Sequence, residues 1–292
     1  MKKSLLTFAA PALLGMTIAG SSIAQNKPLE LKVFSAEESG FYVSSVLVTG
    51  EKEAVLLDTQ FTRANALRVA AMILESGKHL NTVYISQADP DYYFGAEVIK
   101  EIFPDAKIVA SAGTVDHIKA NLQKKLQVWG PQLGVNGPKT PVIPEVWTAS
   151  SIDLEGKKLE LVGYDAPEDY KHYVWIPSIK AIAGGVTTFA DLHVWTADTA
   201  QKEARANWVK SLDQMLSLQA STVVPGHLKS GAKLDASQLI YTRDYLKKFE
   251  QEFDQSKNAA ALIDRMKKAY PNAGLGIALD LGAKVSKGEM KW

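Results

Sequence analysis

Side chains suited to acid–base chemistry or to metal binding gather in three short segments, each of which follows a run of apolar residues. The segments are residues 86–95, 181–195 and 223–227. Loops that follow strands are frequent sites of catalytic and binding residues, because a rigid scaffold positions them. The side chains of interest in these segments are Gln87, Asp89, Asp91, Tyr92, His193, Trp195 and His227.

Composition restricts the chemistry further. The 292 residues include no cysteine and only 5 histidines, so disulfides, thiolate zinc sites, iron–sulfur clusters and a cysteine nucleophile are excluded. The 33 Lys and Arg residues against 32 Asp and Glu residues give a formal charge of +1. A nucleic-acid partner is not expected from such a balance, because phosphate binding requires a basic surface.

The elements that position these segments alternate between strands and helices. Val-, Ile- and aromatic-rich runs predict strands, at residues 29–36, 41–49, 54–57, 83–86, 107–110, 146–149, 159–163, 172–176, 180–183 and 222–224. Helical spacing predicts helices that end before Gly77 and others around 95–102, 115–128, 208–216, 239–253, 259–269 and 277–285. Residues 130–144 are dense in Gly and Pro and predict an irregular loop that acts as a lid or a binding loop.

Neither half of the chain has enough elements to close a core alone. We therefore expect residues 25–292 to form one domain of two packed sheets with outer helices and additional C-terminal helices.

The first 24 residues have the composition of a secretory signal peptide. A basic start is followed by an apolar run and by Ser22-Ile23-Ala24, which suits cleavage after Ala24. The alternative is a membrane anchor, but the run is shorter than the ~20 residues of a spanning helix. Gln25 rather than Cys follows the cleavage point, so no lipid anchor is expected. The sequence predicts an exported protein, periplasmic or secreted, without a membrane anchor after cleavage.

Several spaced landmarks resemble the metallo-β-lactamase-fold superfamily. They are Leu56-Leu57-Asp58-Thr59, the loop from Gln87 to Gly95, Trp175-Ile176-Pro177 with Ala183-Gly184-Gly185, and Pro225-Gly226-His227. The resemblance extends from about residue 30 to residue 230. It implies an α/β fold, a four-layer αββα sandwich whose metal ligands lie on loops at the shared edge of the two sheets.

The metal-binding pattern of that family is largely missing. Aligned on Asp91 and Gly95, the family's His-x-His-x-Asp-His motif reads Gln87-x-Asp89-x-Asp91-Tyr92, and Gly185 stands at the position of the bridging Asp. The intervening family histidine falls near Pro167 and Glu168, neither of which is His. Only Asp91 and His227 occupy ligand positions, so the resemblance implies that the ordinary di-zinc centre and its hydrolysis are lost.

A single divalent metal is the most that these residues predict. Asp89, Asp91 and His227, joined by Glu168, form an oxygen-rich donor set suited to Mn or Fe(II). The alternative is structural. In this alternative, Asp89-Pro90 marks the start of a helix, and Asp91 accepts hydrogen bonds from loop amides. His227 is then a packed residue that the fold retains.

The remaining residues of interest predict a pocket for a small organic molecule. Gln87, Tyr92, His193, Trp195 and Glu168 are its expected ligand-binding residues, with Tyr92 pointing inward and Trp129 adding an aromatic wall. The alternative is that the aromatic rings fill the seam between the sheets and that His193 is an ordinary loop histidine.

Two functions follow from these residues. The first is a hydrolase of a small ester, lactone or amide, with Asp89 or Asp91 as base, His227 beside it and at most one metal ion. The second is a non-catalytic ligand-binding protein that uses the former active-site pocket. The sequence leaves enzymatic status open, and no dedicated feature favours a structural or partner-binding role.

Overall fold

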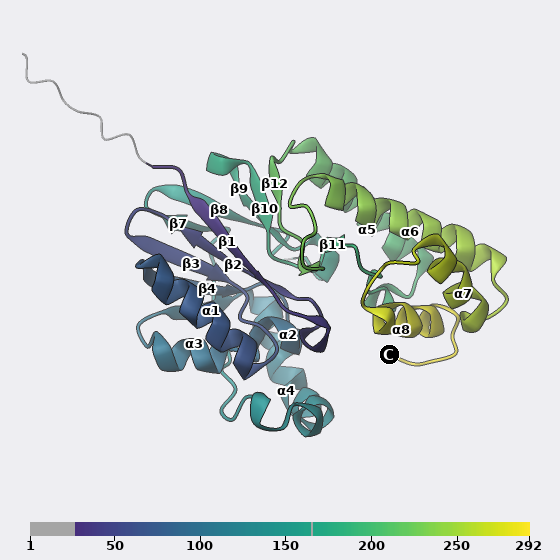
Figure 1. Cartoon of the computed structure of the whole chain (residues 1–292), viewed down its shortest axis with the longest axis horizontal. Helices are drawn as coiled ribbons and strands as arrows, with labels where there is room; N and C mark the ends of the chain where they lie inside the picture. Colours follow the sequence, from purple (N-terminus) through teal and green to yellow (C-terminus); the bar gives the residue numbers. More distant parts are fainter. Residues whose placement is uncertain (1–26, 165) are drawn as a thin grey trace, which may run out of the picture.

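The computed structural model describes residues 27–164 and 166–292, and the predicted signal peptide therefore lies outside the described residues. Two β-sheets pack face to face, and helices cover both outer faces (Figure 1). Three apolar clusters separate the four layers, one between the sheets and one beneath each helical layer. The predicted four-layer αββα sandwich is confirmed.

The first sheet is built from the N-terminal half of the chain. Its strands, in spatial order, are β1 (Glu30–Ser35), β2 (Ser44–Thr49), β3 (Glu53–Leu57), β4 (His79–Ile85), β5 (Lys107–Ala110) and β6 (Glu145–Val146). β1 to β3 pair antiparallel and β3 to β6 pair parallel. Every residue of β2 is buried, because one face packs on helices and the other on the second sheet.

Three main helices cover the outer face of the first sheet, namely α1 (Arg63–Ser76), α3 (Ala96–Ile102) and α4 (Ala112–Leu133). A one-turn helix, α2 (Pro90–Tyr93), lies at the end of the loop after β4. α1 buries Val69, Ala70 and Ile73 against the sheet, and it ends at Gly77, whose φ of 65° forms the left-handed cap.

The second sheet is mainly antiparallel. Its spatial order is β12 (Thr222–Val223), β10 (Ala181–Ala183), β9 (Tyr173–Ile176), β8 (Lys157–Val162) and β7 (Ser151–Leu154). A short parallel pair of β11 (Phe189–Ala190) and β13 (His227–Leu228) lies beside it. Leu161 and Val174 of this sheet pack against Val48 and Leu57 of the first sheet.

Short 3-10 helices connect several of these elements. They are η1 (Glu38–Gly40), η2 (Gly134–Asn136), η3 (Asp169–Lys171), η4 (Pro177–Ile179) and η5 (Ala197–Thr199).

The predicted lid loop at residues 130–144 is wrong in its first part. α4 continues through Pro131 to Leu133, and the chain becomes irregular only from η2 onward. Trp129 explains the extension, because its ring packs edge-on against Phe41 at 5.4 Å and Phe61 at 5.5 Å between ring centroids. These aromatic contacts hold the last turn of α4 on the core.

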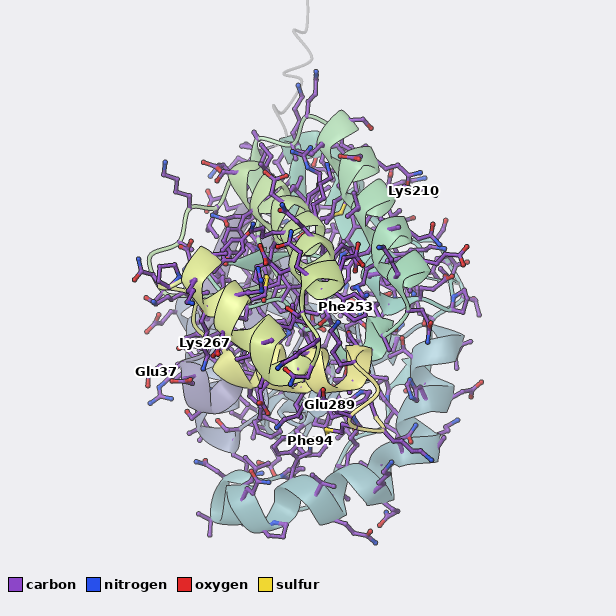
Figure 2. All side chains as sticks on the ribbon, turned by 90° about the vertical axis from the view of Figure 1, so that its right-hand side faces the viewer. Glu37, Phe94, Lys210, Phe253, Lys267 and Glu289 are labelled. Carbon is purple, nitrogen blue, oxygen red and sulfur yellow. The ribbon has the colours of Figure 1, made fainter. Side chains whose placement is uncertain are left out.

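Four helices cover the second sheet, namely α5 (Lys202–Ser217), α6 (Ser237–Gln255), α7 (Ala259–Ala269) and α8 (Gly276–Ser286). Figure 2 views the molecule from this side, with Lys210 marking α5, Phe253 marking α6 and Lys267 marking α7. Among the described residues, no helix combines the length and the apolar composition that crossing a membrane requires.

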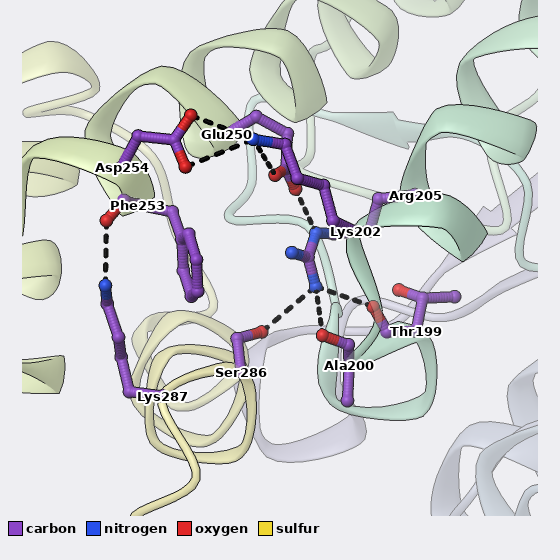
Figure 3. A network of polar contacts seen from close by, with 9 residues as sticks. All are labelled: Thr199, Ala200, Lys202, Arg205, Glu250, Phe253, Asp254, Ser286 and Lys287. Carbon is purple, nitrogen blue, oxygen red and sulfur yellow. Dashed lines mark hydrogen bonds and ion pairs between the residues drawn. The ribbon is translucent and has the colours of Figure 1, made fainter.

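A buried arginine joins α5 to α6 and α8 (Figure 3). Arg205 is 1% exposed, and its guanidinium pairs with Glu250 and donates to the carbonyl oxygens of Thr199 at 2.8 Å and Ala200 at 2.7 Å. It also donates to the Ser286 hydroxyl at 3.2 Å. A buried cation needs such partners to offset its lost hydration, so the three helices are fixed relative to one another.

Candidate functional site

The three polar segments of the sequence meet at one edge of the sandwich. The backbone N–H of Gly185, after β10, donates to the Ser86 hydroxyl, after β4, at 2.9 Å. Tyr92 of α2 and His227 of β13 are joined by a hydrogen bond of 3.0 Å. Segments more than 90 residues apart in sequence therefore form one site.

His227 lies at the centre of this site and both of its ring nitrogens are occupied. Nδ1 is 2.8 Å from the carbonyl oxygen of Phe41, which can only accept, so Nδ1 carries the proton. Nε2 is then the acceptor for the Tyr92 hydroxyl. Burial lowers the pKa of the imidazole to about 4, although the Phe41 carbonyl opposes this. The ring is therefore neutral near pH 7.

Asp91 lies next to this pair. Its Oδ2 is 3.8 Å from Nε2 of His227, which is too long for a hydrogen bond. Burial, followed by repulsion from Asp89, raises the pKa of the Asp91 carboxyl to about 8. A backbone hydrogen bond and the charge of Lys125 lower the pKa only in part, and the neutral imidazole adds no positive charge, so the protonated carboxyl predominates at pH 7.

A second buried carboxyl supports the loop from behind. Asp58 accepts hydrogen bonds from the backbone N–H and the hydroxyl of Ser86, both at 2.7 Å. Burial raises its pKa to about 7, and the two bonds from Ser86 lower it in part. Ser86 in turn accepts from Gly185, so these residues connect the ends of β3, β4 and β10.

Gly185 cannot be replaced by the aspartate of the family pattern in this backbone. Its φ of 77° is in the left-handed region, and a Cβ atom there would lie 1.8 Å from the carbonyl oxygen of His172. The nearby Gly95 shows the same close approach, with a Cβ atom 1.9 Å from the Thr59 carbonyl oxygen. Glycine at both positions lets the site loops contact neighbouring backbone directly.

The Asp89 side chain makes a contact that the sequence did not predict. Asp89 precedes α2 and Pro90 begins it, as the structural alternative predicted, but the Asp89 side chain makes no capping hydrogen bond. Its Oδ1 instead pairs with Nζ of Lys125 on α4 at 3.0 Å. The Asp89 carboxylate is therefore directed toward α4 and is already bound to a cation.

Gln87, at the first position of the family motif, is 1% exposed. Its Nε2 donates to the carbonyl oxygen of Asp169 at 3.3 Å. Its Oε1 is buried and accepts no hydrogen bond from any described residue. A buried acceptor without a partner is costly, so this oxygen is a candidate contact for a ligand.

The other three predicted pocket residues make their polar contacts elsewhere. His193 is buried with Nδ1 3.0 Å from the Tyr245 hydroxyl, and burial lowers its pKa to about 4. Glu168 pairs with Lys171 at 2.9 Å. The Trp195 indole donates to Asp198 at 2.8 Å. No described hydrogen bond or ion pair connects these three residues to Tyr92 or His227.

The donor set does not fit a metal centre of the family type. Within residues 27–164 and 166–292, no group of three or more His, Asp or Glu side chains is gathered closely enough to hold a metal ion. The predicted trio of Asp89, Asp91 and His227 is thus not brought together as a ligand set. His227 Nε2, the nitrogen that would face a metal, accepts from Tyr92, and Asp89 is paired with Lys125.

Several site residues carried no recognisable signal in the sequence. Phe41 fixes the tautomer of His227, and it adopts a φ of 57°, while Asp58 has a φ of 61°. Non-glycine residues with positive φ are strained and are often found at functional sites. Lys125 and Asp169 reach the site only through the tertiary fold. Asp58 was visible as a family landmark, but its bond to Ser86 was not.

The comparisons with known proteins agree with this architecture. The model of the family described as the metallo-beta-lactamase superfamily matches residues 39–227, which is more than half of the chain. The chain belongs to the metallo-β-lactamase superfamily. The match ends at His227, the last residue of the site. A comparison with curated proteins finds no match.

Solved structures of this superfamily superpose on the chain at low sequence identity. A metallo-β-lactamase family protein from Thermus thermophilus is 15% identical with a TM-score of 0.59, covering 90% of this chain and 93% of its own. A metallo-β-lactamase from Pontibacter korlensis is 20% identical with a TM-score of 0.54, covering 75% of this chain and 95% of its own. The metallo-β-lactamase DIM-1 is 19% identical with a TM-score of 0.52, covering 76% and 94%. These similarities establish the fold.

Proposed function

We propose that this metallo-β-lactamase-fold protein binds a small organic ligand in the former metal pocket, without a di-zinc centre. The observation that carries the proposal is the hydrogen bond from the Tyr92 hydroxyl to Nε2 of His227. With Nδ1 committed to the Phe41 carbonyl, the one imidazole lone pair available to a metal is already used. A metal would have to break a buried hydrogen bond before it gained a ligand.

The rest of the site supports the same function. Gly185 cannot carry a bridging carboxylate, because its Cβ atom would collide with the His172 carbonyl. Gln87 and Tyr92 replace two metal-binding histidines with side chains suited to hydrogen bonding. A group of buried polar side chains without a metal-ligand set is suited to hydrogen bonding with an organic molecule.

The experiment is a thermal-shift screen of small metabolites against the purified mature chain, with and without EDTA. A ligand at 100 times its Kd adds about 2.7 kcal/mol to the free energy of unfolding, which raises the Tm by several degrees. We expect at least one shift that persists in EDTA. A screen without any shift, or shifts that EDTA abolishes, would overturn the proposal. Elemental analysis of the same protein is expected to find no stoichiometric zinc.

A second function, metal-independent hydrolysis of a small ester, lactone or amide, is favoured by one observation. The buried Asp91 carboxyl lies 3.8 Å from His227, and burial and the nearby Asp89 raise its pKa to about 8. In ionised form Asp91 would take a proton from a water whose oxygen attacks the carbonyl carbon, and would return that proton to the leaving group.

Hydrolysis of p-nitrophenyl acetate or a γ-lactone tests this second function. The rate is expected to rise with pH through about 8 and to fall to the background level in Asp91→Asn. Equal rates in Asp91→Asn and in the native chain would refute it. We further propose export through the N-terminal signal, which is tested by finding the mature chain in the periplasmic or secreted fraction with Gln25 as its first residue.

A further inference from the structure

A groove between β1, the start of α1 and the end of α4, which we name the α1 groove, contains none of the residues of the Tyr92–His227 site. Its volume is about 520 Å³, within the range of about 300–1,000 Å³ that is typical of small-molecule sites. Its walls come from residues 34–39, 62–68 and 132–136. The last of these segments lies in the Gly- and Pro-rich stretch for which the sequence predicted a lid or a binding loop.

The lining of the α1 groove is mostly polar and carries no net charge. Eight of its eleven residues have polar side chains, and the other three are Phe34, Ala64 and Leu133. Its charged members are Glu37, which Figure 2 labels at the edge of the molecule, and Arg68. No ion pair of the described residues includes either of them. One carboxylate and one guanidinium among neutral groups favour a ligand that is itself neutral.

Asn65 is a buried side chain that opens onto this groove. It is 7% exposed, and its Oδ1 accepts from the Arg68 guanidinium at 2.7 Å. Because a guanidinium can only donate, this bond fixes the orientation of the amide and leaves Nδ2 on the other side. Nδ2 donates to no described residue, yet it is not one of the described polar atoms that are both unpaired and fully enclosed. This donor is therefore free and reachable from the groove.

Thr62, the N-cap of α1, provides a second donor of the same kind. It is 8% exposed, and its hydroxyl oxygen accepts from the backbone N–H of Asn65 at 3.1 Å. The hydroxyl proton has no acceptor among the described residues. Across the groove, Asn136 accepts from the backbone N–H of Ala64 at 3.2 Å, which joins η2 to α1. Two unused donors in a preformed groove point to a ligand that offers acceptor oxygens.

We propose that the α1 groove binds a neutral saccharide of one or two sugar units. This site is additional to the ligand pocket of the proposed function and does not depend on it. Each sugar hydroxyl both accepts and donates, so a sugar can accept from Asn65 and Thr62 and donate to Glu37. The fork of N–H donors on Arg68 suits two neighbouring hydroxyl oxygens of one ring. The half-buried Phe34 provides a surface for the apolar C–H face of the ring.

A peptide is the other neutral ligand that both donates and accepts hydrogen bonds. Its side chains would need apolar pockets, and the groove has three apolar lining residues against eight polar ones. The composition of the lining therefore favours the saccharide.

Calorimetric titration of the purified chain with glucose, galactose, mannose, N-acetylglucosamine, maltose and cellobiose tests the proposal. We expect at least one of these sugars to bind. We also expect its Kd to change little with added salt, because the ligand carries no charge for salt to screen.

Two variants locate the binding in the groove. Glu37→Ala should weaken it by about ten-fold, because hydrogen bonds to a charged group are lost. The Glu37 side chain caps no helix, so the Tm without ligand should not change. Asn65→Leu should also weaken binding, while the bond to Thr62 remains, because it uses the backbone N–H of residue 65. Glu75→Ala is the matched control, since it removes an equal charge from the exposed last turn of α1, outside the groove, and it should keep the native Kd.

The outcomes separate this site from the former metal pocket. If none of the sugars binds, the saccharide proposal is wrong. If a sugar binds with native affinity to both Glu37→Ala and Asn65→Leu, it is held elsewhere, and the groove proposal fails while the proposed function stands. If a Gly-Ser peptide binds, loses affinity in these two variants and no sugar binds, the groove is a peptide site and the saccharide proposal is overturned.

Discussion

Removal of one oxygen atom tests the central hydrogen bond of the site. In Tyr92→Phe, Nε2 of His227 loses the hydroxyl that lies 3.0 Å away. Tyr92 is 1% exposed and His227 is 6% exposed, so water cannot readily take its place. A change of tautomer cannot remove the unsatisfied acceptor, because Nδ1 must keep its proton to donate to the Phe41 carbonyl oxygen.

The expected cost is that of leaving one buried acceptor unsatisfied, about 1–3 kcal/mol. Tyr93 provides a matched control within the same helix. It is also 1% exposed, but its hydroxyl has no described partner. Tyr93→Phe should therefore not lower the free energy of unfolding, because it removes a buried hydroxyl that has no described partner, although the two substitutions remove the same atom from adjacent residues.

Equilibrium unfolding in urea measures both variants. We expect the midpoint to fall in Tyr92→Phe at an unchanged m-value, which would show a loss of native stability rather than a change in the unfolded chain. In thermal unfolding the same loss corresponds to a fall in Tm of about 2–4 °C per kcal/mol. Equal stability of Tyr92→Phe and Tyr93→Phe would refute the assignment of Tyr92 as the partner that occupies His227.

Three other changes have expected outcomes. Gly185→Ala should lower the Tm strongly, because the added Cβ atom would lie 1.8 Å from the carbonyl oxygen of His172. Gly184→Ala is the control, because no atom would lie nearer than 3.4 Å to its Cβ. It should lower the free energy of unfolding only by the strain of an alanine at a φ of 70°, about 1–2 kcal/mol. Arg205→Met should lower the free energy of unfolding, measured in urea, by about 3–5 kcal/mol. The reason is that Glu250 and two carbonyl oxygens lose their buried cationic partner. Asp91 and Asp58 have raised pKa values of about 8 and about 7 in the folded chain, so folding favours their protonated forms. The stability that this protonation contributes is complete below about pH 4, near the pKa of Asp in the unfolded chain, and is lost as pH rises toward 8. Asp91→Asn should therefore flatten the decline of the unfolding free energy between pH 4 and 8.

The fold was predictable because its signals are local and repeated. Apolar runs bounded by turn residues marked the strands, and α7 and α8 were predicted to within about one residue. The sequence failed where a tertiary contact overrides local preference. α4 runs through Pro131 because Trp129 packs on Phe41 and Phe61, and no feature of residues 130–144 reveals those partners.

The candidate site was predictable in its location but not in its contacts. The residues were found because they follow strands and match spaced landmarks, and the structure does bring Tyr92 to His227. The tautomer of His227 depends on the Phe41 carbonyl, 186 residues away in sequence. The partner of Asp89 lies on α4 and that of Gln87 lies in η3. Such pairings are set by packing between distant elements, which a single sequence does not encode in any local pattern.

The residues at the positions of the family's metal ligands contact one another and the surrounding chain in a consistent way. Tyr92 binds the histidine that remains, Asp89 binds Lys125, and Gly185 lies against the His172 carbonyl. Each of these positions thus has a contact within the chain itself. Restoring a single histidine at Tyr92 would remove the partner of His227 and would still lack a carboxylate at Gly185. This arrangement is therefore stabilised by contacts among its own residues, and a di-zinc site of the family type would require several simultaneous changes, including a different backbone at Gly185.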